Sequence, residues 1–391
     1  MKIAAIRCFR LSGSATYGAT EERKADLLDA YPALGARRPA DRTPGGRVTA
    51  VYVEVSTDDG ASGLFGPIFE EAAALIRRLA PALIGRDPRA YELLWDLLYR
   101  QAYAFGGGGG KGYQMMAVSA LDLALWDLRG KLAGQPVCAL IGGPVQPVVR
   151  CYASMLGCSL ESERVRERAR QAAARGYTAQ KWFFRHGPAD GAAGIEKNVA
   201  LVRTVREAVG PEVEIMFDCS MAWDPTYTVR VLERIAEFRP CWLEEPLPPE
   251  GNANLGAIRQ ATRIPIAAGE HEYTRWGFQQ LLQTGAVDMV QPDPEWCGGL
   301  TETLKICALA SAYGRPVYPH GHSVSAAWNL VCAQPPTVCP MLEFLCNFQP
   351  LAQHFHTRYI EPVSGMLETP QTAGLGIELD PAKIEQRVEL A

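Results

Sequence analysis

Three carboxylates stand at equal spacing in the second half of the sequence. Asp218, Glu244 and Glu270 each close a short, mainly apolar run, and consecutive members are 26 residues apart. Such runs are typical of buried parallel strands, and a gap of this size fits one strand, one helix and two short loops. The acids are therefore expected at the carboxyl ends of three successive strands. Oxygen donors grouped in this way are the ligands that Mg²⁺ prefers.

The same periodicity continues on both sides of these acids. Asp293, His320 and Glu343 close later apolar runs, and Lys181 closes an earlier one. Seven consecutive strand-end candidates thus carry a charged or titratable side chain. In (β/α) barrels the catalytic groups lie at the carboxyl ends of the strands. The pattern therefore predicts a barrel with its active site at that end.

The composition of the chain is that of a globular enzyme. Its 391 residues exceed an ordinary single domain and suit a barrel with a smaller companion. The net charge of −4 gives no reason to expect nucleic acid or an anionic membrane as a partner, and no run is long enough to span a membrane. The eleven cysteines include no Cys-x-x-Cys pair, and the N-terminal apolar run is too short for a signal peptide. We therefore expect free thiols and a cytoplasmic location.

Periodicity outside the strand ends indicates further elements. Strands are expected over 1–11 and 48–57, with apolar residues alternating in the second. A helix is expected over 115–133, with Gly134 as its stop. A long polar segment, from Ser12 to Gly46, joins the two strands, and a loop of that length in a compact protein is usually functional. We predict that it forms a lid that discriminates among substrates.

The motifs around these acids resemble the enolase superfamily, and within it the mandelate racemase subgroup. The motifs that carry this resemblance are 242–246 (WLEEP), 269–270 (GE), 292–293 (PD) and 298–299 (GG). A narrower likeness is to the branch of L-rhamnonate dehydratases. It is carried by residues 218–223 (DCSMAW), 269–275 (GEHEYTR) and 296–302 (WCGGLTE).

The resemblance spans nearly the whole chain and implies the fold of the superfamily. That fold is α/β: a modified TIM (β/α) barrel with an α+β capping domain. The implied parts are an N-terminal capping domain (1–135), a catalytic barrel (140–355) and a C-terminal segment that returns to the capping domain (356–391). The resemblance also implies that Glu343 hydrogen-bonds the substrate carboxylate and that Lys181 lies near it. Trp223 and His271 come just after two metal-bearing strand ends, so we expect them to contact substrate.

These residue types suit the removal of a proton next to a carboxylate group. The resulting enediolate carries extra negative charge, which Mg²⁺ held by the three acids would stabilise. His320 is a suitable base near neutral pH, because Asp293 would fix its tautomer and raise its basicity.

The second predicted strand distinguishes between reaction types. Racemases of the subgroup would carry Lys-x-Lys there, whereas this chain has Lys181, Trp182 and Phe183. A phenyl ring cannot transfer a proton, so His320 is left as the one base, which favours elimination of water over racemisation. Cycloisomerase members would carry a lysine on the sixth strand, where Asp293 stands.

We therefore predict an acid-sugar dehydratase that needs Mg²⁺. It would convert an aldonate similar to rhamnonate into a 2-keto-3-deoxy acid through an enediolate. Two alternatives stay open: an epimerase or racemase, if Lys181 reaches the far face of the substrate, and a non-catalytic sugar-acid binding protein on an inherited barrel. The expected partners are the small-molecule acid sugar and further copies of the chain in a homo-oligomer.

Overall fold

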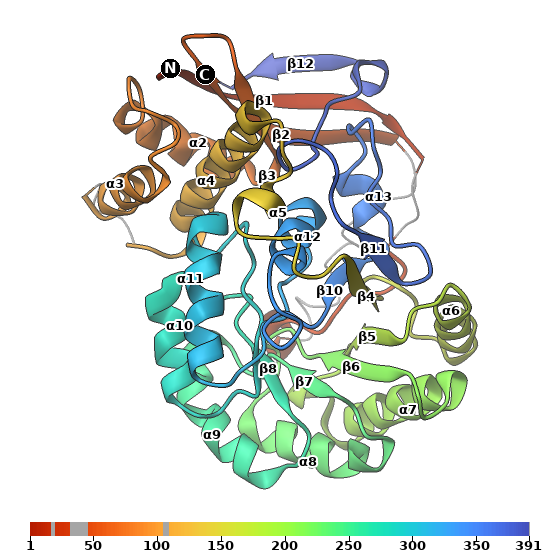
Figure 1. Cartoon of the computed structure of the whole chain (residues 1–391). Coiled ribbons are helices and arrows are strands. Elements are labelled where there is room, and N and C mark those ends of the chain that lie inside the picture. The colour runs from red at the N-terminus through yellow and green to blue at the C-terminus, as the bar shows by residue number, and fades with distance from the viewer. Residues whose placement is uncertain (17–19, 32–45, 105–108, 391) are drawn as a thin grey trace.

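The structure, a computed structural model, describes residues 1–16, 20–31, 46–104 and 109–390. Figure 1 shows an antiparallel sheet with helices beside it at one end of the molecule, and a curled parallel sheet ringed by helices at the other. All eleven cysteines lie in the described ranges, and all are free thiols. Within those same ranges, no helix is long and apolar enough to cross a membrane.

The antiparallel sheet joins the two ends of the sequence. Its strand order is β12-β1-β2-β3, and the central pair runs from Ile3 opposite Thr57 to Ala15 opposite Gly46. The strands predicted near the N-terminus are confirmed, although the first extends further than expected. Their bounds are β1 (Ile3–Ala15), β2 (Gly46–Thr57), β3 (Ser62–Ile68) and β12 (Gln386–Glu389).

Three helices pack beside this sheet, and one of them joins it to the barrel. They are α2 (Glu70–Leu79), α3 (Tyr91–Ala104) and α4 (Gly112–Ala133). The helix predicted before Gly134 is confirmed, and Gly134 ends it in a left-handed conformation, with φ of 63°. α4 packs against both β3 and α11 (Gly299–Ala312). Asp122 on α4 accepts hydrogen bonds from the backbone N–H (2.9 Å) and the hydroxyl group (2.6 Å) of Thr301 on α11.

The parallel sheet has the strand order β10-β4-β5-β6-β7-β8-β9, and β11 (Met366–Glu368) pairs antiparallel with β4. Beyond β9, a single bridge between Val290 and Val317 continues the curl. The prediction of a strand before His320 is wrong, since the described residues there form only the bridge at Val317. The reason is that Pro316 and Pro319 have no N–H to donate to a strand ladder. The bounds are β4 (Val148–Ser154), β5 (Ala179–Phe183), β6 (Glu214–Asp218), β7 (Trp242–Glu244), β8 (Ile266–Ala268), β9 (Met289–Val290) and β10 (Leu342–Leu345).

Helices alternate with these strands and cover the outside of the curl (Figure 1), as a (β/α) barrel requires. They are α6 (Ser162–Ala174), α7 (Gly191–Val209), α8 (Pro225–Ile235), α9 (Asn252–Ala261), α10 (Thr274–Gln283), α11 and α12 (Val324–Cys332), with the short α5 (Val137–Leu140) and α13 (Gln349–Ala352). A separate cluster of side chains from the strands and their flanks packs together: Tyr152, Ala179, Met216, Trp242, Ala267, Met289 and Met341. The predicted α/β barrel with an antiparallel companion sheet is confirmed.

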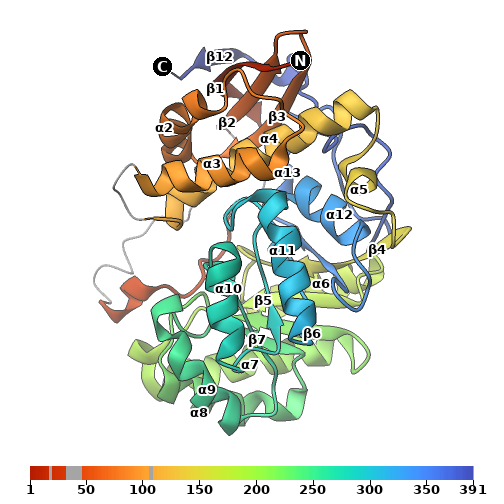
Figure 2. The same ribbon diagram turned by 60° about the vertical axis from the view of Figure 1, so that its left-hand side comes forward.

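One segment of the N-terminal part crosses to the barrel. Residues 20–31 follow β1 and end in the 3₁₀ helix η1 (Leu27–Ala30) (Figure 2). Backbone N–H groups of Glu21 and Ala25 donate to Gly157 and Phe184, in the loops after β4 and β5. The predicted lid from Ser12 to Gly46 includes residues 17–19 and 32–45, which lie outside the described residues. Residues 20–31 are the part of its middle that the structure places.

Candidate active site

The three equally spaced acids lie side by side at the carboxyl ends of their strands. Asp218 and Glu244 are the last residues of β6 and β7 and are direct neighbours across the pair, while Glu270 follows β8. All three are buried. Glu270 owes its position to Gly269, whose φ of +126° suits glycine, and a Cβ there would stand 2.8 Å from the Phe278 ring. The spacing of the acids in the sequence therefore becomes proximity in space.

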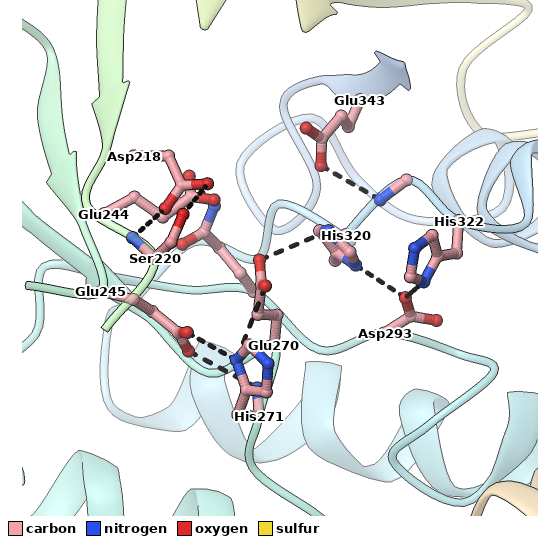
Figure 3. Close-up of polar contacts among 12 residues, drawn as sticks. Asp218, Ser220, Glu244, Glu245, Glu270, His271, Asp293, His320, His322 and Glu343 are labelled. Atoms are coloured by element: carbon pink, nitrogen blue, oxygen red, sulfur yellow. Dashed lines mark hydrogen bonds and ion pairs between the residues drawn. The ribbon is translucent and has the colours of Figure 1, made fainter. Parts of the chain in front are cut away.

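The loops after these strands hold the acids in place through unusual backbone geometry (Figure 3). Ser220 donates its backbone N–H (2.7 Å) and its hydroxyl group (3.2 Å) to the carboxylate of Asp218. Ser220, Met221 and Glu245 all have positive φ angles, of 51°, 63° and 36°. Such conformations are costly for residues other than glycine and persist where the surrounding structure enforces them, often at functional sites.

Lys181 forms ion pairs with two glutamates, Glu244 from the three acids and Glu343 from the last strand of the barrel. Its Nζ lies 2.5 Å from Oε1 of Glu244 and 2.8 Å from Oε1 of Glu343. Glu244 also accepts hydrogen bonds from Trp242 (3.0 Å) and Gln291 (2.6 Å). Burial raises the pKa of Glu244 to about 7, against the charge of Lys181. Lys181 is therefore a fixed counter-ion of the acids rather than a free amine.

Glu343 is held at the eighth strand position by close packing. It lies on β10 and accepts a hydrogen bond from the backbone N–H of Gly321 (3.0 Å). A Cβ at position 321 would stand 2.8 Å from Cγ of Glu343, so glycine is required for this approach.

The predicted base and its partner form a hydrogen-bonded pair (Figure 3). His320 Nδ1 lies 2.7 Å from Oδ2 of Asp293, and both residues are buried. The opposite ring nitrogen, Nε2, therefore faces the acids and lies 3.3 Å from Glu270. Burial would raise the pKa of Asp293, but the hydrogen bond with His320 and the contact with His322 (3.5 Å) hold it below its usual value. This geometry leaves Nε2 as the atom that can exchange a proton with a substrate.

The pKa of His320 depends on its contact with Glu270. Burial lowers this pKa, but Glu270 and Asp293 outweigh burial and raise it to about 10. A base needs a pKa nearer to the operating pH. Because Glu270 has the largest raising effect, a cation that engages Glu270 would bring the pKa of His320 back toward that range.

The donor set fits Mg²⁺ in its chemistry. Burial raises the pKa of Asp218, and the nearby charge of Glu270 adds to that effect while Lys24 opposes it. Buried carboxylates this close together are costly unless cations accompany them, and hard oxygen donors are those that Mg²⁺ prefers.

The described side chains also form two tighter groups of ligand atoms, each within 4.8 Å, and neither is the predicted triad. They are Glu245 with Glu270 and His271, and Asp293 with His320 and His322. In this structure Glu270 contacts His271 (3.5 Å) and His320 (3.3 Å), and metal ligation would replace those contacts. Imidazole donors suit transition metals better than Mg²⁺. Ligation of Mg²⁺ by Asp218, Glu244 and Glu270 therefore stays a prediction.

A small cavity brings most of the predicted residues together. It is lined by Lys24, Ser154, Leu156, Lys181, Trp182, Phe183, Asp218, Glu270, His320, Glu343 and Leu345. Its free volume of about 20 Å³ has room for about one water molecule. A larger cavity of about 710 Å³ lies beside β11 and the start of β4, at the other end of the barrel. That lining contains none of the charged strand-end residues, so chemistry rather than size locates the site.

Two predicted substrate contacts lie outside the lining of this cavity. The indole N–H of Trp223 donates to the backbone oxygen of His186 (2.9 Å), and its ring packs between Phe184 and Tyr227. His271 bonds through Nδ1 to Glu245 (2.6 Å) (Figure 3). The structure therefore gives Trp223 a packing role and places His271 beside the acids, while contact of either with substrate stays a prediction.

Sequence reasoning missed three residues at this site. Glu245 orients His271, and the ring of Trp296 packs against both His320 and His322, at centroid distances of 5.3 and 4.7 Å. Lys24 lines the cavity although it precedes the barrel by more than a hundred residues. The motifs at 242–246 and 296–302 contain Glu245 and Trp296, so their place beside predicted strand ends could have marked them as candidates. Lys24 stands in a polar segment without periodicity, so no sequence signal marks it.

Comparisons with known proteins agree with the fold of the chain. Residues 37–142 match the model of the mandelate racemase / muconate lactonizing enzyme N-terminal domain, and residues 164–383 match the enolase C-terminal domain-like model. An L-rhamnonate dehydratase from Saccharopolyspora erythraea is 36% identical over 350 residues, which cover 85% of this chain and 83% of that protein.

Solved structures of similar fold include two enzymes of different activity. The rhamnonate dehydratase from Gibberella zeae, complexed with Mg, has a TM-score of 0.83 and 31% identity, with 98% of this chain and 95% of that chain covered. The 3,6-anhydro-D-galactonate cycloisomerase from Zobellia galactanivorans has a TM-score of 0.80 and 29% identity, with 99% of this chain and 100% of that chain covered.

Proposed function

This chain belongs to the mandelate racemase and muconate lactonizing enzyme family of the enolase superfamily, and on that premise we propose that it is an acid-sugar dehydratase that uses Mg²⁺. Its substrate would be an aldonate similar to rhamnonate, and its product the corresponding 2-keto-3-deoxy acid. The similarity to rhamnonate dehydratases supports the substrate class.

The reaction type rests on one observation: among the described residues that line the cavity, His320 is the one imidazole, and it points a free ring nitrogen at the acids. His320 presents Nε2 to the acids while Asp293 holds Nδ1. Phe183 lines the cavity at the position where a second-strand base would stand, and Lys181 is held between Glu244 and Glu343. The epimerase alternative needs a proton donor or acceptor on the second face, and Lys181 is not free to serve.

The residues can perform the elimination with one proton carrier. His320 Nε2 takes the proton from C2, next to the carboxylate, and Asp293 stabilises the imidazolium that forms. Mg²⁺, when held by Asp218, Glu244 and Glu270, supplies positive charge that stabilises the enediolate. The bond between C3 and its hydroxyl group then breaks, and the proton on His320 leaves with that hydroxyl as water. The enol that remains tautomerises to the 2-keto acid.

The test is a screen of aldonic and aldaric acids for keto-acid formation with Mg²⁺ present. We expect turnover of one or a few aldonates, no turnover after chelation, and none with His320→Asn. A protein that binds an aldonate but forms no keto acid and exchanges no α-proton in D₂O would instead be the non-catalytic binding protein. Accumulation of the C2 epimer would favour the epimerase.

A further inference from the structure

One residue in the lining of the small cavity at the strand ends, which contains Asp218, Glu270 and His320, comes from outside the barrel. Lys24 belongs to the segment 20–31, which follows the first strand of the antiparallel sheet. The other lining residues lie at or just after strand ends of the barrel. This lysine is therefore the one group that the N-terminal part of the chain, as far as the structure describes it, adds to the wall of the cavity.

The segment that carries Lys24 is fixed to the barrel on both sides of it. The N–H groups of Glu21 and Ala25 donate to backbone oxygens of the barrel at 2.8 and 2.7 Å, and Ala25 is fully buried. Arg185, in the loop after β5, pairs with Glu22 (3.5 Å) and Asp29 (3.6 Å). These contacts on both sides define where the backbone of Lys24 lies.

Among the residues that the structure describes, the ammonium group of Lys24 has no hydrogen-bond or ion-pair partner. The neighbouring Arg23 is paired with Asp29, whereas no carboxylate among the described residues lies within 4.0 Å of Lys24 Nζ. The side chain is half-buried and lines a cavity whose walls carry the carboxylates of Asp218, Glu270 and Glu343. A half-buried cation without a fixed partner is available to an anionic ligand.

The two lysines of the cavity differ in their contacts with the acids. Lys181 bonds Glu244 (2.5 Å) and Glu343 (2.8 Å) directly. Lys24 makes no such contact with a described carboxylate, but it lines the cavity together with Asp218 and Glu270. Lys24 is therefore the lysine that shares the cavity with two of the acids predicted to hold the metal and has no direct bond to them.

We propose that Lys24 contacts the substrate, donating a hydrogen bond from Nζ to the carboxylate end of the acid and to the enediolate formed from it. This inference rests on the proposed function and deepens it. An anionic substrate has to enter a cavity bordered by several carboxylates, and an unpaired ammonium group lowers that repulsion. The charge on the acid end grows as C2 loses its proton, so the contact strengthens in the transition state.

The contact also gives the segment 20–31 a function. The cavity is far smaller than the 300–1,000 Å³ of typical ligand sites, so a sugar acid has to displace part of its wall. Lys24 lies on the wall that is not built from barrel strand ends. Binding of the acid would therefore shift the side chain of Lys24, while the contacts of Glu21 and Ala25 hold the backbone of the segment beside the cavity.

The test compares Lys24→Met with Lys24→Arg, which keeps the charge, and with Lys197→Met, which removes an exposed lysine on α7. Two binding constants are measured by calorimetry: Mg²⁺ to the metal-free protein, and L-lactate to the Mg²⁺-loaded protein. L-lactate is a 2-hydroxy acid with no hydroxyl group at C3, so it cannot undergo the elimination and its binding does not depend on turnover. Equal thermal stability of the variants shows that they are folded.

Lys24→Met should bind Mg²⁺ more tightly, because a nearby positive charge has been removed, and should bind L-lactate about tenfold more weakly or worse. With an aldonate substrate, kcat should fall in addition to a rise in KM. Lys24→Arg should keep most of both affinities, and Lys197→Met should match the unmodified protein.

Two results would overturn the inference. Tighter Mg²⁺ binding with unchanged lactate binding would make Lys24 a counter-ion of the acids alone, and two unchanged constants would mean that its side chain does not act in the site. If lactate binding depends on Lys24 but no sugar acid is dehydrated, the contact stands and the proposed function fails. If sugar acids are dehydrated equally well by Lys24→Met, the function stands and this contact fails.

Discussion

Replacing Lys181 by methionine should destabilise the metal-free protein strongly. Its ammonium group lies 2.5 Å from Glu244 and 2.8 Å from Glu343, and the lysine side chain is 5% exposed while both glutamates are fully buried. The substitution leaves two buried carboxylates without their shared cation. Removing one partner of a buried ion pair costs about 3–5 kcal/mol. Because Lys181 serves two acids, we expect a loss in the free energy of unfolding near the upper end of that range.

The assay is urea-induced unfolding followed by circular dichroism after chelation. Lys181→Met is compared with Lys197→Met, which should lie within about 0.5 kcal/mol of the unmodified protein because that lysine is exposed. Adding Mg²⁺ should restore part of the loss, since binding to the folded state stabilises it. Adding Glu343→Gln to Lys181→Met should also restore part of it, because one of the two unpaired charges is removed. A loss below about 1 kcal/mol for Lys181→Met would refute the reasoning.

Three further predictions concern the metal, the base and the antiparallel sheet. Glu270→Gln should abolish turnover and weaken Mg²⁺ binding in calorimetry while leaving the fold intact; full activity after exhaustive chelation would contradict the metal assignment. His320→Asn should remove both dehydration and α-proton exchange, and Asp293→Asn should lower kcat by roughly 10²–10⁴-fold with Mg²⁺ binding retained; near-native turnover of His320→Asn would mean that the base is another group. His356, which is buried and hydrogen-bonded to Tyr52 (3.2 Å), has a pKa lowered to about 4 by burial and by Lys383. Because its folded pKa lies below its ordinary value of 6.5, its neutral form is favoured on folding, and up to about 3 kcal/mol of stability should be lost as the pH falls from 6.5 to 4. His356→Gln should flatten this part of the curve in thermal unfolding at a series of pH values, and an unchanged slope would rule the effect out.

The positions of the strand-end residues could be predicted because two regularities act together. A β/α unit has a nearly fixed length, and parallel strands end at one edge of the sheet. Residues 26 apart, such as Asp218 and Glu244, therefore become neighbours in register. The same regularities say nothing about orientation. Trp223 follows the strand that ends in Asp218, yet its indole turns to the backbone of His186.

Features that depend on distant parts of the chain could not be predicted from local pattern. The strand before His320 has the apolar residues of a strand, but its flanking prolines leave a single bridge at Val317. Lys24 reaches the cavity because its segment is pinned to loops after β4 and β5, and no periodicity encodes that return. Lys181 could be placed on its strand, but its bonds to both acids are a matter of three-dimensional packing.

The most direct test of the account is to incubate the enzyme and a reactive aldonate with Mg²⁺ in D₂O and to follow C2 and C3 by NMR. With one base at His320 and Phe183 on the second strand, the 2-keto acid should form with deuterium at C3, and the remaining substrate should keep its C2 configuration. Accumulation of the C2 epimer would contradict the account, because it requires proton transfer on the face opposite His320.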